Sequence, residues 1–171
     1  MDEPRIAQVY AAAELLVACL RDGGAVHICG NGGSAADAQH IAAELAGRFL
    51  RDRRALACSA LTTNTSALTA IGNDYSYDAV FARQVEAVVR PGDVVWIIST
   101  SGGSPSVLAA AKAARARQAK VLGFTGGEGG AMPPLCDVCF IAPAETTYAI
   151  QQLHQIAYHA ICDIVERTVC P

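Results

Sequence analysis

The sequence predicts an α/β protein with three layers, in which helices cover both faces of a five-stranded parallel sheet. Short apolar runs alternate with helical segments along the chain, and this order is typical of parallel sheets joined by helices. The clearest run, residues 93–99, is apolar at both odd and even positions, so we expect both sides of this strand to be covered. Glycine- and serine-rich turns directly follow two of the runs, at the strand ends where such sheets bind ligands.

The first elements are a helix, a strand and a second helix. Apolar side chains have helical spacing over residues 5–21, and a pair of glycines ends this helix within the N-terminal segment 1–22. An apolar strand at 26–29 leads through a glycine turn into a helix that we expect to reach about residue 48. A second apolar run at 55–61 predicts another strand.

The middle of the chain is expected to hold two helices before the clearest strand. A polar cluster at 62–66 can cap a helix over 67–71. We expect the glycine-asparagine-aspartate tripeptide at 72–74 to end that helix. A further helix is predicted at 79–89, where a proline-glycine pair follows it and precedes the strand at 93–99.

The last elements repeat the strand–turn–helix order. Pro105 suits the first turn of a helix that runs to about residue 118. Strands are predicted at 120–125 and 138–142, and a long helix with a strong apolar face at 149–169. The whole chain, residues 1–171, is therefore predicted to form one domain.

Composition fits a soluble assembly of such domains. The 171 residues suit one domain with a real core, and 52% hydrophobic against 17% charged residues suggests surface buried in an oligomer. No apolar run reaches the length of a membrane span, and the N-terminal residues do not have the pattern of a signal peptide. The net charge of −3 gives no basic footprint for nucleic acid. We expect a cytoplasmic protein with neither a membrane nor a nucleic-acid partner.

Seven cysteines, an odd number, are scattered through predicted core segments. Together with the lack of an export signal, this pattern favours reduced thiols in the cytoplasm. Cys136 and Cys139 form a C-x-x-C motif, but no second pair follows, as a zinc ribbon would require. We expect buried structural thiols at these two positions, because free cysteine behaves as a small hydrophobic residue.

The two polar turns predict an anion site. The first covers 30–34 and the second covers 99–104, and each joins a strand to a helix. Backbone N–H groups and hydroxyls at a helix N-terminus bind phosphate without lysine or arginine. Neither turn matches a Walker loop or a dinucleotide fingerprint, which argues against ATP and NAD. Since ligands bind beyond the carboxyl ends of parallel strands, we expect the two turns to lie side by side.

A possible metal site accompanies the first turn. His40 and Glu44 are four residues apart and share one helix face, although such a pair alone is more often a solvated surface. The C-terminal helix adds polar side chains to an otherwise aliphatic segment. They are Gln151, Gln152, His154, Gln155, Tyr158 and His159. Histidine and glutamate are common zinc ligands.

Taken together, these motifs resemble the phosphoheptose isomerase family of sugar isomerase (SIS) domains. The similarity rests on residues 30–45, 70–74, 99–104 and 149–159 and extends over most of the chain from about residue 22 to 165. It implies a flavodoxin-like sheet, a homotetramer with active sites between subunits, and one zinc ion per subunit. The implied reaction interconverts sedoheptulose 7-phosphate and glycero-manno-heptose 7-phosphate, the first step toward bacterial heptoses.

The resemblance also implies roles for individual residues. The implied zinc ligands are His40, Glu44, Gln151 and His159. The implied substrate contacts are Asn31, Gly32, Gly33, Ser34, Asn73, Asp74, Ser99, Thr100, Ser101, Ser104 and Gln151. Glu44 would be the catalytic base and His159 the catalytic acid. Tyr148 stands where the family commonly has an aspartate, so a contact made by that aspartate is lost or supplied elsewhere.

The residue chemistry agrees with an aldose–ketose isomerase. Moving a proton between C1 and C2 through a cis-enediol requires a carboxylate base and a second group for the oxygen protons. A metal or fixed donors must stabilise the developing enediolate. Two alternatives remain open: a non-catalytic adaptor resembling the factor that binds the replication initiator DnaA, and a sugar-phosphate-binding regulator. The first does not need four metal ligands, and no DNA-binding extension accompanies the second.

Helix geometry raises a question about the implied ligand set. Gln151 and His159 are eight residues apart, about 12 Å along an ideal helix and about 80° apart around it. We therefore expect either a site built from more than one subunit or a distorted helix. His154 is a competing ligand, because it follows Gln151 by three residues. His27, in the first strand, is expected to be a core histidine with its hydrogen bonds satisfied.

Overall fold

A computed structural model describes residues 2–170 and contains one five-stranded sheet. All strand pairs are parallel, and the strand order is β2-β1-β3-β4-β5, which is the flavodoxin-like order. The strands are β1 (Val26–Gly30), β2 (Cys58–Ala60), β3 (Val94–Ile98), β4 (Lys120–Gly126) and β5 (Val138–Ala142). The predicted fold class is confirmed.

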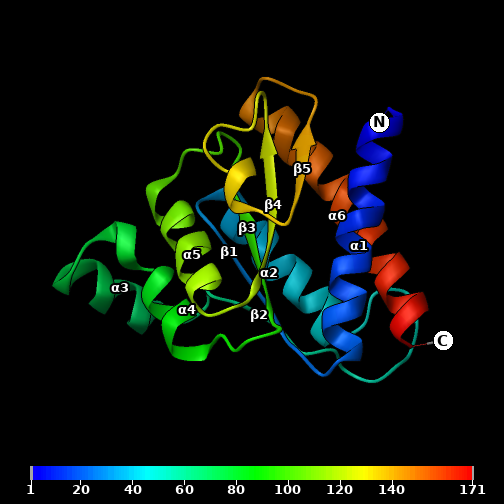
Figure 1. The fold of residues 1–171 in the computed structure, drawn as a ribbon, viewed down its shortest axis with the longest axis horizontal. Coiled ribbons are helices and arrows are strands. Elements are labelled where there is room, and N and C mark those ends of the chain that lie inside the picture. The colour runs from blue at the N-terminus through cyan, green and yellow to red at the C-terminus, as the bar shows by residue number, and fades with distance from the viewer. Residues whose placement is uncertain (1, 171) are drawn as a thin grey trace.

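Helices cover the sheet on both sides (Figure 1). The α-helices are α1 (Glu3–Arg21), α2 (Gly33–Ala46), α3 (Thr65–Asp74), α4 (Ala82–Val88), α5 (Pro105–Ala116) and α6 (Thr147–Val169), with short 3-10 helices η1 (Tyr77–Ala79) and η2 (Pro133–Leu135). α1, α2 and α6 pack on one face of the sheet, where Trp96 and Phe124 are fully buried. α4 and α5 pack on the other face, over Val95 and Ile97. Because successive β3 side chains alternate between the two cores, every position of this strand is apolar.

The register of the central strands brings the two polar turns together. β1 pairs with β3 so that Gly30 is opposite Ile98. Each strand ends there, and a turn leads from it into α2 or α5. The predicted juxtaposition of the turns is therefore confirmed, and it follows directly from parallel pairing of neighbouring strands.

Three predicted boundaries were wrong. β2 has only three residues, Cys58–Ala60, rather than the run 55–61. α3 continues through residues 72–74, which were expected to end it. A Cβ atom on Gly72 would meet only Val80, at 3.7 Å, so no close packing depends on this glycine, and a glycine within a helix costs only about 1 kcal/mol relative to alanine. The helix predicted at 79–89 is divided into η1 and α4.

The other expectations for polar and sulfur side chains are mostly confirmed. The Asn64 side chain accepts a hydrogen bond from the Ala67 N–H and caps α3. His27 is buried, as expected, and its Nδ1 lies 3.0 Å from the Ser59 hydroxyl. The expectation that both ring nitrogens are hydrogen-bonded was wrong, because the buried Nε2 has no hydrogen-bond partner and lies 3.5 Å from an Asp93 carboxylate oxygen. All seven cysteines are free, but Cys136 and Cys139 are half-buried rather than buried. No helix among residues 2–170 is long and apolar enough to cross a membrane.

Candidate active site

A polar pocket of about 330 Å³ lies where the two turns meet. Its lining residues are Asn31, Gly32, Gly33, Ser34, Ile98, Ser99, Thr100, Ser104, Thr147 and Gln151. The pocket is at the carboxyl ends of β1 and β3 and at the N-terminus of α2. Unpaired N–H groups and the helix dipole give such a position a positive potential. The pocket can therefore bind an anion without a basic side chain in its lining.

Hydroxyl groups are concentrated on the second turn. The Oγ atom of Ser99 lies 3.0 Å from Ser104 Oγ and 3.4 Å from Ser101 Oγ. Ser101 Oγ also accepts a hydrogen bond from the Gly103 N–H. Ser99 is buried, whereas Ser101 is exposed and lies outside the pocket lining. Ser99 and Ser104 thus point a pair of hydroxyls, each able to donate or accept, at the pocket.

Asn31 is held in place at the first turn. Its Nδ2 donates to Ser106 Oγ at 3.0 Å, and its Oδ1 accepts from the Tyr77 hydroxyl at 2.8 Å. Besides Ser101, two predicted substrate contacts are not part of the pocket lining. Asn73 and Asp74 are exposed at the end of α3, where Asn73 Nδ2 donates to Asp74 Oδ1 at 2.9 Å. In this single chain they have no connection to the anion site.

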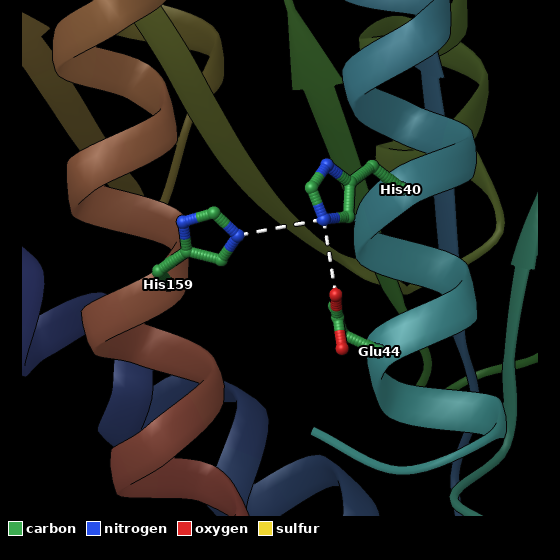
Figure 2. Close-up of side chains that lie close together, drawn as sticks. All are labelled: His40, Glu44 and His159. Carbon is green, nitrogen blue, oxygen red and sulfur yellow. Dashed lines mark hydrogen bonds and ion pairs between the residues drawn. The ribbon is translucent and has the colours of Figure 1, made fainter. Parts of the chain in front are cut away.

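The second half of the site is a cluster of three potential metal ligands (Figure 2). His40 and Glu44 project from α2, and His159 projects toward them from α6. His40 Nε2 lies 3.0 Å from Glu44 Oε1 and 3.4 Å from His159 Nε2. One ligand atom from each residue lies within 4.8 Å of the others. Packing of α6 on α2 therefore brings together residues that are 119 positions apart in the chain.

This cluster fits a zinc ion by the chemistry and spacing of its donors. Two imidazole nitrogens and a carboxylate oxygen form a typical zinc ligand set, and three protein ligands leave a position open. Ligand atoms about 2.1 Å from a tetrahedral zinc lie about 3.4 Å from each other. The separation of 3.4 Å between the two Nε2 atoms matches that value.

Tyr158 and Asp37 hold the imidazole of His40 through its Nδ1 side, away from the cluster. The Tyr158 hydroxyl lies 3.0 Å from His40 Nδ1 and donates to Asp37 Oδ1 at 3.4 Å. Burial raises the pKa of the Asp37 carboxyl, and burial together with the nearby Asp37 raises the pKa of the Tyr158 hydroxyl. A fixed partner on Nδ1 orients the imidazole and leaves Nε2 directed at the cluster, which is the usual support for a metal-binding histidine.

Gln151 lies with the anion pocket and not with the three clustered ligands. A Cβ atom added to Gly33 would collide with the Gln151 amide, so this side chain lies over the N-terminus of α2. α6 is continuous from Thr147 to Val169, and the expectation of a distorted helix is therefore wrong. Within one chain, Gln151 is about 12 Å along the helix from His159. A Gln151 ligand to the metal stays a prediction that requires another subunit.

His154 is not a ligand in this arrangement. Its side chain is fully buried, its Nε2 lies 2.9 Å from the Thr125 carbonyl oxygen, and its ring packs beside Phe124 at 5.3 Å between centroids. Burial lowers the pKa of this imidazole. His154 and His159 are five residues apart, which places them about 140° apart around α6. His154 therefore faces the sheet, whereas His159 belongs to the cluster with His40 and Glu44.

Sequence reasoning missed several contributors to the site. Thr147, the first residue of α6, lines the pocket. The sequence motifs assigned no role to Asp37 or Tyr158. Asp37 precedes His40 by three residues on the same helix face, a spacing that could have suggested a partner. The contact between Tyr158 and His40 spans 118 positions, and no local pattern could have revealed it.

The chain is similar in sequence and in overall structure to known proteins. Residues 1–126 match the SIS domain family model. The phosphoheptose isomerase of Rhodospirillum rubrum is 53% identical over 167 residues, covering 98% of this chain and 87% of that protein. The structure of phosphoheptose isomerase GmhA from Neisseria gonorrhoeae superposes with a TM-score of 0.90 at 47% identity, covering 95% of this chain and 86% of that one. A phosphoheptose isomerase structure from Francisella tularensis also gives 0.90, at 38% identity and with coverage of 96% and 86%.

Proposed function

Because the chain belongs to the SIS domain family and, within it, to the phosphoheptose isomerases, we propose that it is an aldose–ketose isomerase. Its substrate would be sedoheptulose 7-phosphate and its product D-glycero-D-manno-heptose 7-phosphate, a precursor of bacterial heptoses. The observation that carries the proposal is the cluster formed by His40 and Glu44, on the helix that begins at the anion pocket, and His159 of α6. α2 thus connects the phosphate site to the proposed base, and the packing of α6 on α2 adds the proposed acid.

The layout suits a phosphorylated sugar. The substrate's phosphate would accept hydrogen bonds from Ser34, Ser99 and Ser104 and from the N–H groups at the start of α2. Ser34 and His40 are separated by one and two-thirds helical turns, about 9 Å. The carbon chain of a heptose phosphate can bridge this distance. Anchoring the phosphate would hold C1 and C2 against the catalytic side chains and lower the entropic part of the barrier.

Glu44 and His159 would share the proton transfers. The Glu44 carboxylate is partly exposed, so it can take the proton from the carbon beside the carbonyl and return it to the neighbouring carbon of the enediol. His159 Nε2 faces the same space and would move the proton between the two sugar oxygens. Each group is restored at the end, as an isomerisation requires.

We further propose that His40, Glu44 and His159 hold a zinc ion, with Gln151 of another subunit as the fourth ligand. When bound, the ion would polarise the sugar oxygens and stabilise negative charge on them. His40 would act mainly through its position, since its Nδ1 is held by Tyr158. The carboxylate of Glu44 would have to serve both as ligand and as base.

Self-association as a homotetramer is part of the same proposal. Large apolar side chains are exposed on two of the three helices that cover one face of the sheet: Ile6 and Tyr10 on α1, and Tyr148 and Ile156 on α6. Burial of such surface favours subunit contacts. Asn73 and Asp74 on α3 could then reach the active site of a neighbouring subunit.

The seven free thiols suit a reducing cytoplasm, where we place the enzyme.

A direct assay tests the proposal. The protein is incubated with sedoheptulose 7-phosphate, with and without a strong chelator, and the aldose product is measured. We expect turnover that chelation abolishes and zinc restores. Absence of turnover with every divalent metal tried would overturn the isomerase assignment and favour the non-catalytic adaptor. Turnover after complete metal removal would leave the isomerase standing and refute the zinc role.

Substitution of the base sharpens the test. Glu44→Gln should reduce kcat by about a thousandfold or more, while the circular dichroism spectrum is unchanged. Glu86→Gln is the matched control, because Glu86 is exposed on α4 and forms only a surface ion pair with Arg83. Substantial activity in Glu44→Gln would show that the base is misassigned.

A further inference from the structure

We infer that Phe49 is a positioning residue for His159, and that a buried ion pair between Arg53 and Glu166 holds Phe49 in place. This inference rests on the proposed function, because it assigns His159 to the catalytic site. It concerns the segment 47–54, which leaves α2 and carries no side chain of the cluster itself.

Glu166 organises this segment through its backbone. Its carboxylate accepts hydrogen bonds from three consecutive N–H groups, those of Phe49 at 3.0 Å, Leu50 at 2.8 Å and Arg51 at 3.0 Å. The Glu166 side chain is completely buried. A carboxylate in this position would be costly without such partners, and successive N–H groups facing one anion form a fixed concave site. The path of residues 49–51 is thereby fixed relative to α6.

Arg53 joins the same carboxylate to the end of α2. Its Nε donates to Glu166 Oε1 at 3.1 Å, and the guanidinium is 3% exposed. Its other donors reach carbonyl oxygens of Glu44 at 2.7 Å, Leu45 at 2.9 Å, Gly47 at 2.8 Å and Arg54 at 3.0 Å. These carbonyls include unpaired groups at the C-terminus of α2, where a cation is favoured by the helix dipole. The ion pair therefore ties together the two helices that carry the candidate catalytic groups.

Phe49 connects the anchored segment to the catalytic site through its contact with His159. Its ring is stacked on the His159 imidazole, with a centroid distance of 5.6 Å and only 5° between the ring planes. Tyr158 and His40 contact the same imidazole edge-to-face, at 4.6 and 5.1 Å. A parallel ring on one side resists rotation of the imidazole about its χ2 angle, a broad torsion that packing must otherwise define. Phe49 thus fixes the direction in which His159 Nε2 points.

The spacing of His159 and Glu166 along α6 allows both to face segment 47–54. Glu166 follows His159 by seven residues, close to two helical turns, so the two side chains lie on the same side of the helix. Glu166 binds the backbone of residues 49–51 in the middle of segment 47–54, and the ring of Phe49 lies against His159 two turns earlier on the helix. A charged pair that only stabilised the loop would not require an aromatic side chain at residue 49.

The test compares Phe49→Leu with Phe49→Tyr in the full-length protein. Leucine keeps apolar volume but loses the flat ring, whereas tyrosine keeps the ring. We expect Phe49→Leu to lower kcat about tenfold with less than a twofold change in the KM for sedoheptulose 7-phosphate, and Phe49→Tyr to retain wild-type kcat. Leu50→Ala is the matched control, because the Leu50 side chain is 61% exposed in the same segment.

A second readout does not depend on activity. The His159 Cε1–H proton should move in the NMR spectrum when the ring current of Phe49 is lost; the chain has only four histidines, so single substitutions assign the signals. We expect this displacement in Phe49→Leu and in Glu166→Gln, and its absence in Phe49→Tyr and Leu50→Ala.

The outcomes separate the inference from the proposed function. An unmoved His159 signal in Phe49→Leu would overturn the inference, and so would a moved signal with unchanged kcat in an active enzyme. A change in thermal stability alone, with signal and kcat unchanged, would also overturn it. If the wild-type protein had no isomerase activity but the signal moved as expected in both Phe49→Leu and Glu166→Gln, the positioning of His159 would stand and the proposed function would fail.

Discussion

Glu166→Gln should lower the free energy of unfolding by about 3–5 kcal/mol, the usual effect of breaking a buried ion pair by removing one partner. Glutamine has nearly the same volume but carries no charge and has only one acceptor oxygen. The three N–H donors of residues 49–51 and the Arg53 guanidinium share the two carboxylate oxygens. At least one donor is left unpaired, and Arg53 becomes a buried charge without its partner.

The magnitude can be measured by thermal unfolding followed by circular dichroism, with all variants at one protein concentration because an oligomer's melting temperature depends on it. For a chain of 171 residues, 1 kcal/mol corresponds to about 3 °C, so we expect Tm to fall by about 9–15 °C. Arg167→Gln is the matched control: Arg167 is next to Glu166 on α6 but forms an exposed ion pair with Asp163, at 2.7 Å. Such pairs contribute about 0–1 kcal/mol.

The pair can be isolated by a double-mutant cycle with Arg53→Met. Removing both charges should cost less than the sum of the two single changes, because the second change then leaves no unpaired charge behind. A loss below about 1 kcal/mol in Glu166→Gln, or additive single effects, would refute the argument that this carboxylate organises the segment.

Three further predictions concern pH, the metal and the anion pocket. Burial alone would raise the pKa of Glu166, but its N–H donors and Arg53 outweigh burial and hold the pKa below the ordinary value. The contribution of the Glu166 carboxylate to the free energy of unfolding should therefore be complete above the unfolded-state pKa of about 4.3 and disappear as pH falls. A Tm difference between wild type and Glu166→Gln that persists undiminished at pH 3 would contradict this. Tyr158→Phe removes the hydroxyl beside His40 Nδ1 and should weaken zinc binding about 10–100-fold in competition with a chromophoric chelator, with Tyr10→Phe, exposed on α1, as the control. Ser99→Ala should raise the KM for the sugar phosphate about tenfold or more with a smaller effect on kcat; an unchanged KM would mean that the phosphate binds elsewhere.

Local sequence patterns were sufficient for most of the architecture. The order of strands and helices, the cap at Asn64 and the helix start at Pro105 all depend on residues close together in the chain. The exceptions have two different causes, pairing between distant strands for β2 and the lack of a local constraint for α3. β2 is short because only residues 58–60 pair with β1, and α3 continues past Gly72 because nothing there requires a turn.

The candidate site was predicted only in part, because its two halves depend on the fold to different degrees. The anion pocket follows from the sequence once the sheet is known to be parallel, since neighbouring strand ends must meet. Its outlying predicted members, Asn73 and Asp74, lie on a helix that buries no residue in this chain. Their predicted role as substrate contacts depends on the proposed self-association, because both lie outside the pocket lining of this chain.

The sequence by itself determined the fold class and the presence of two polar turns, the first of which is followed by a His/Glu pair. These features depend on the spacing of apolar residues and on glycines at the turns. Tertiary structure alone decided which histidine of α6 joins His40 and Glu44. His154 faces the sheet and bonds to Thr125, whereas His159 faces α2 and lies against Phe49. The apolar face of α6 follows from helical spacing and is buried against the rest of the core. That the opposite side, with His159, meets α2 depends on contacts between residues far apart in the chain.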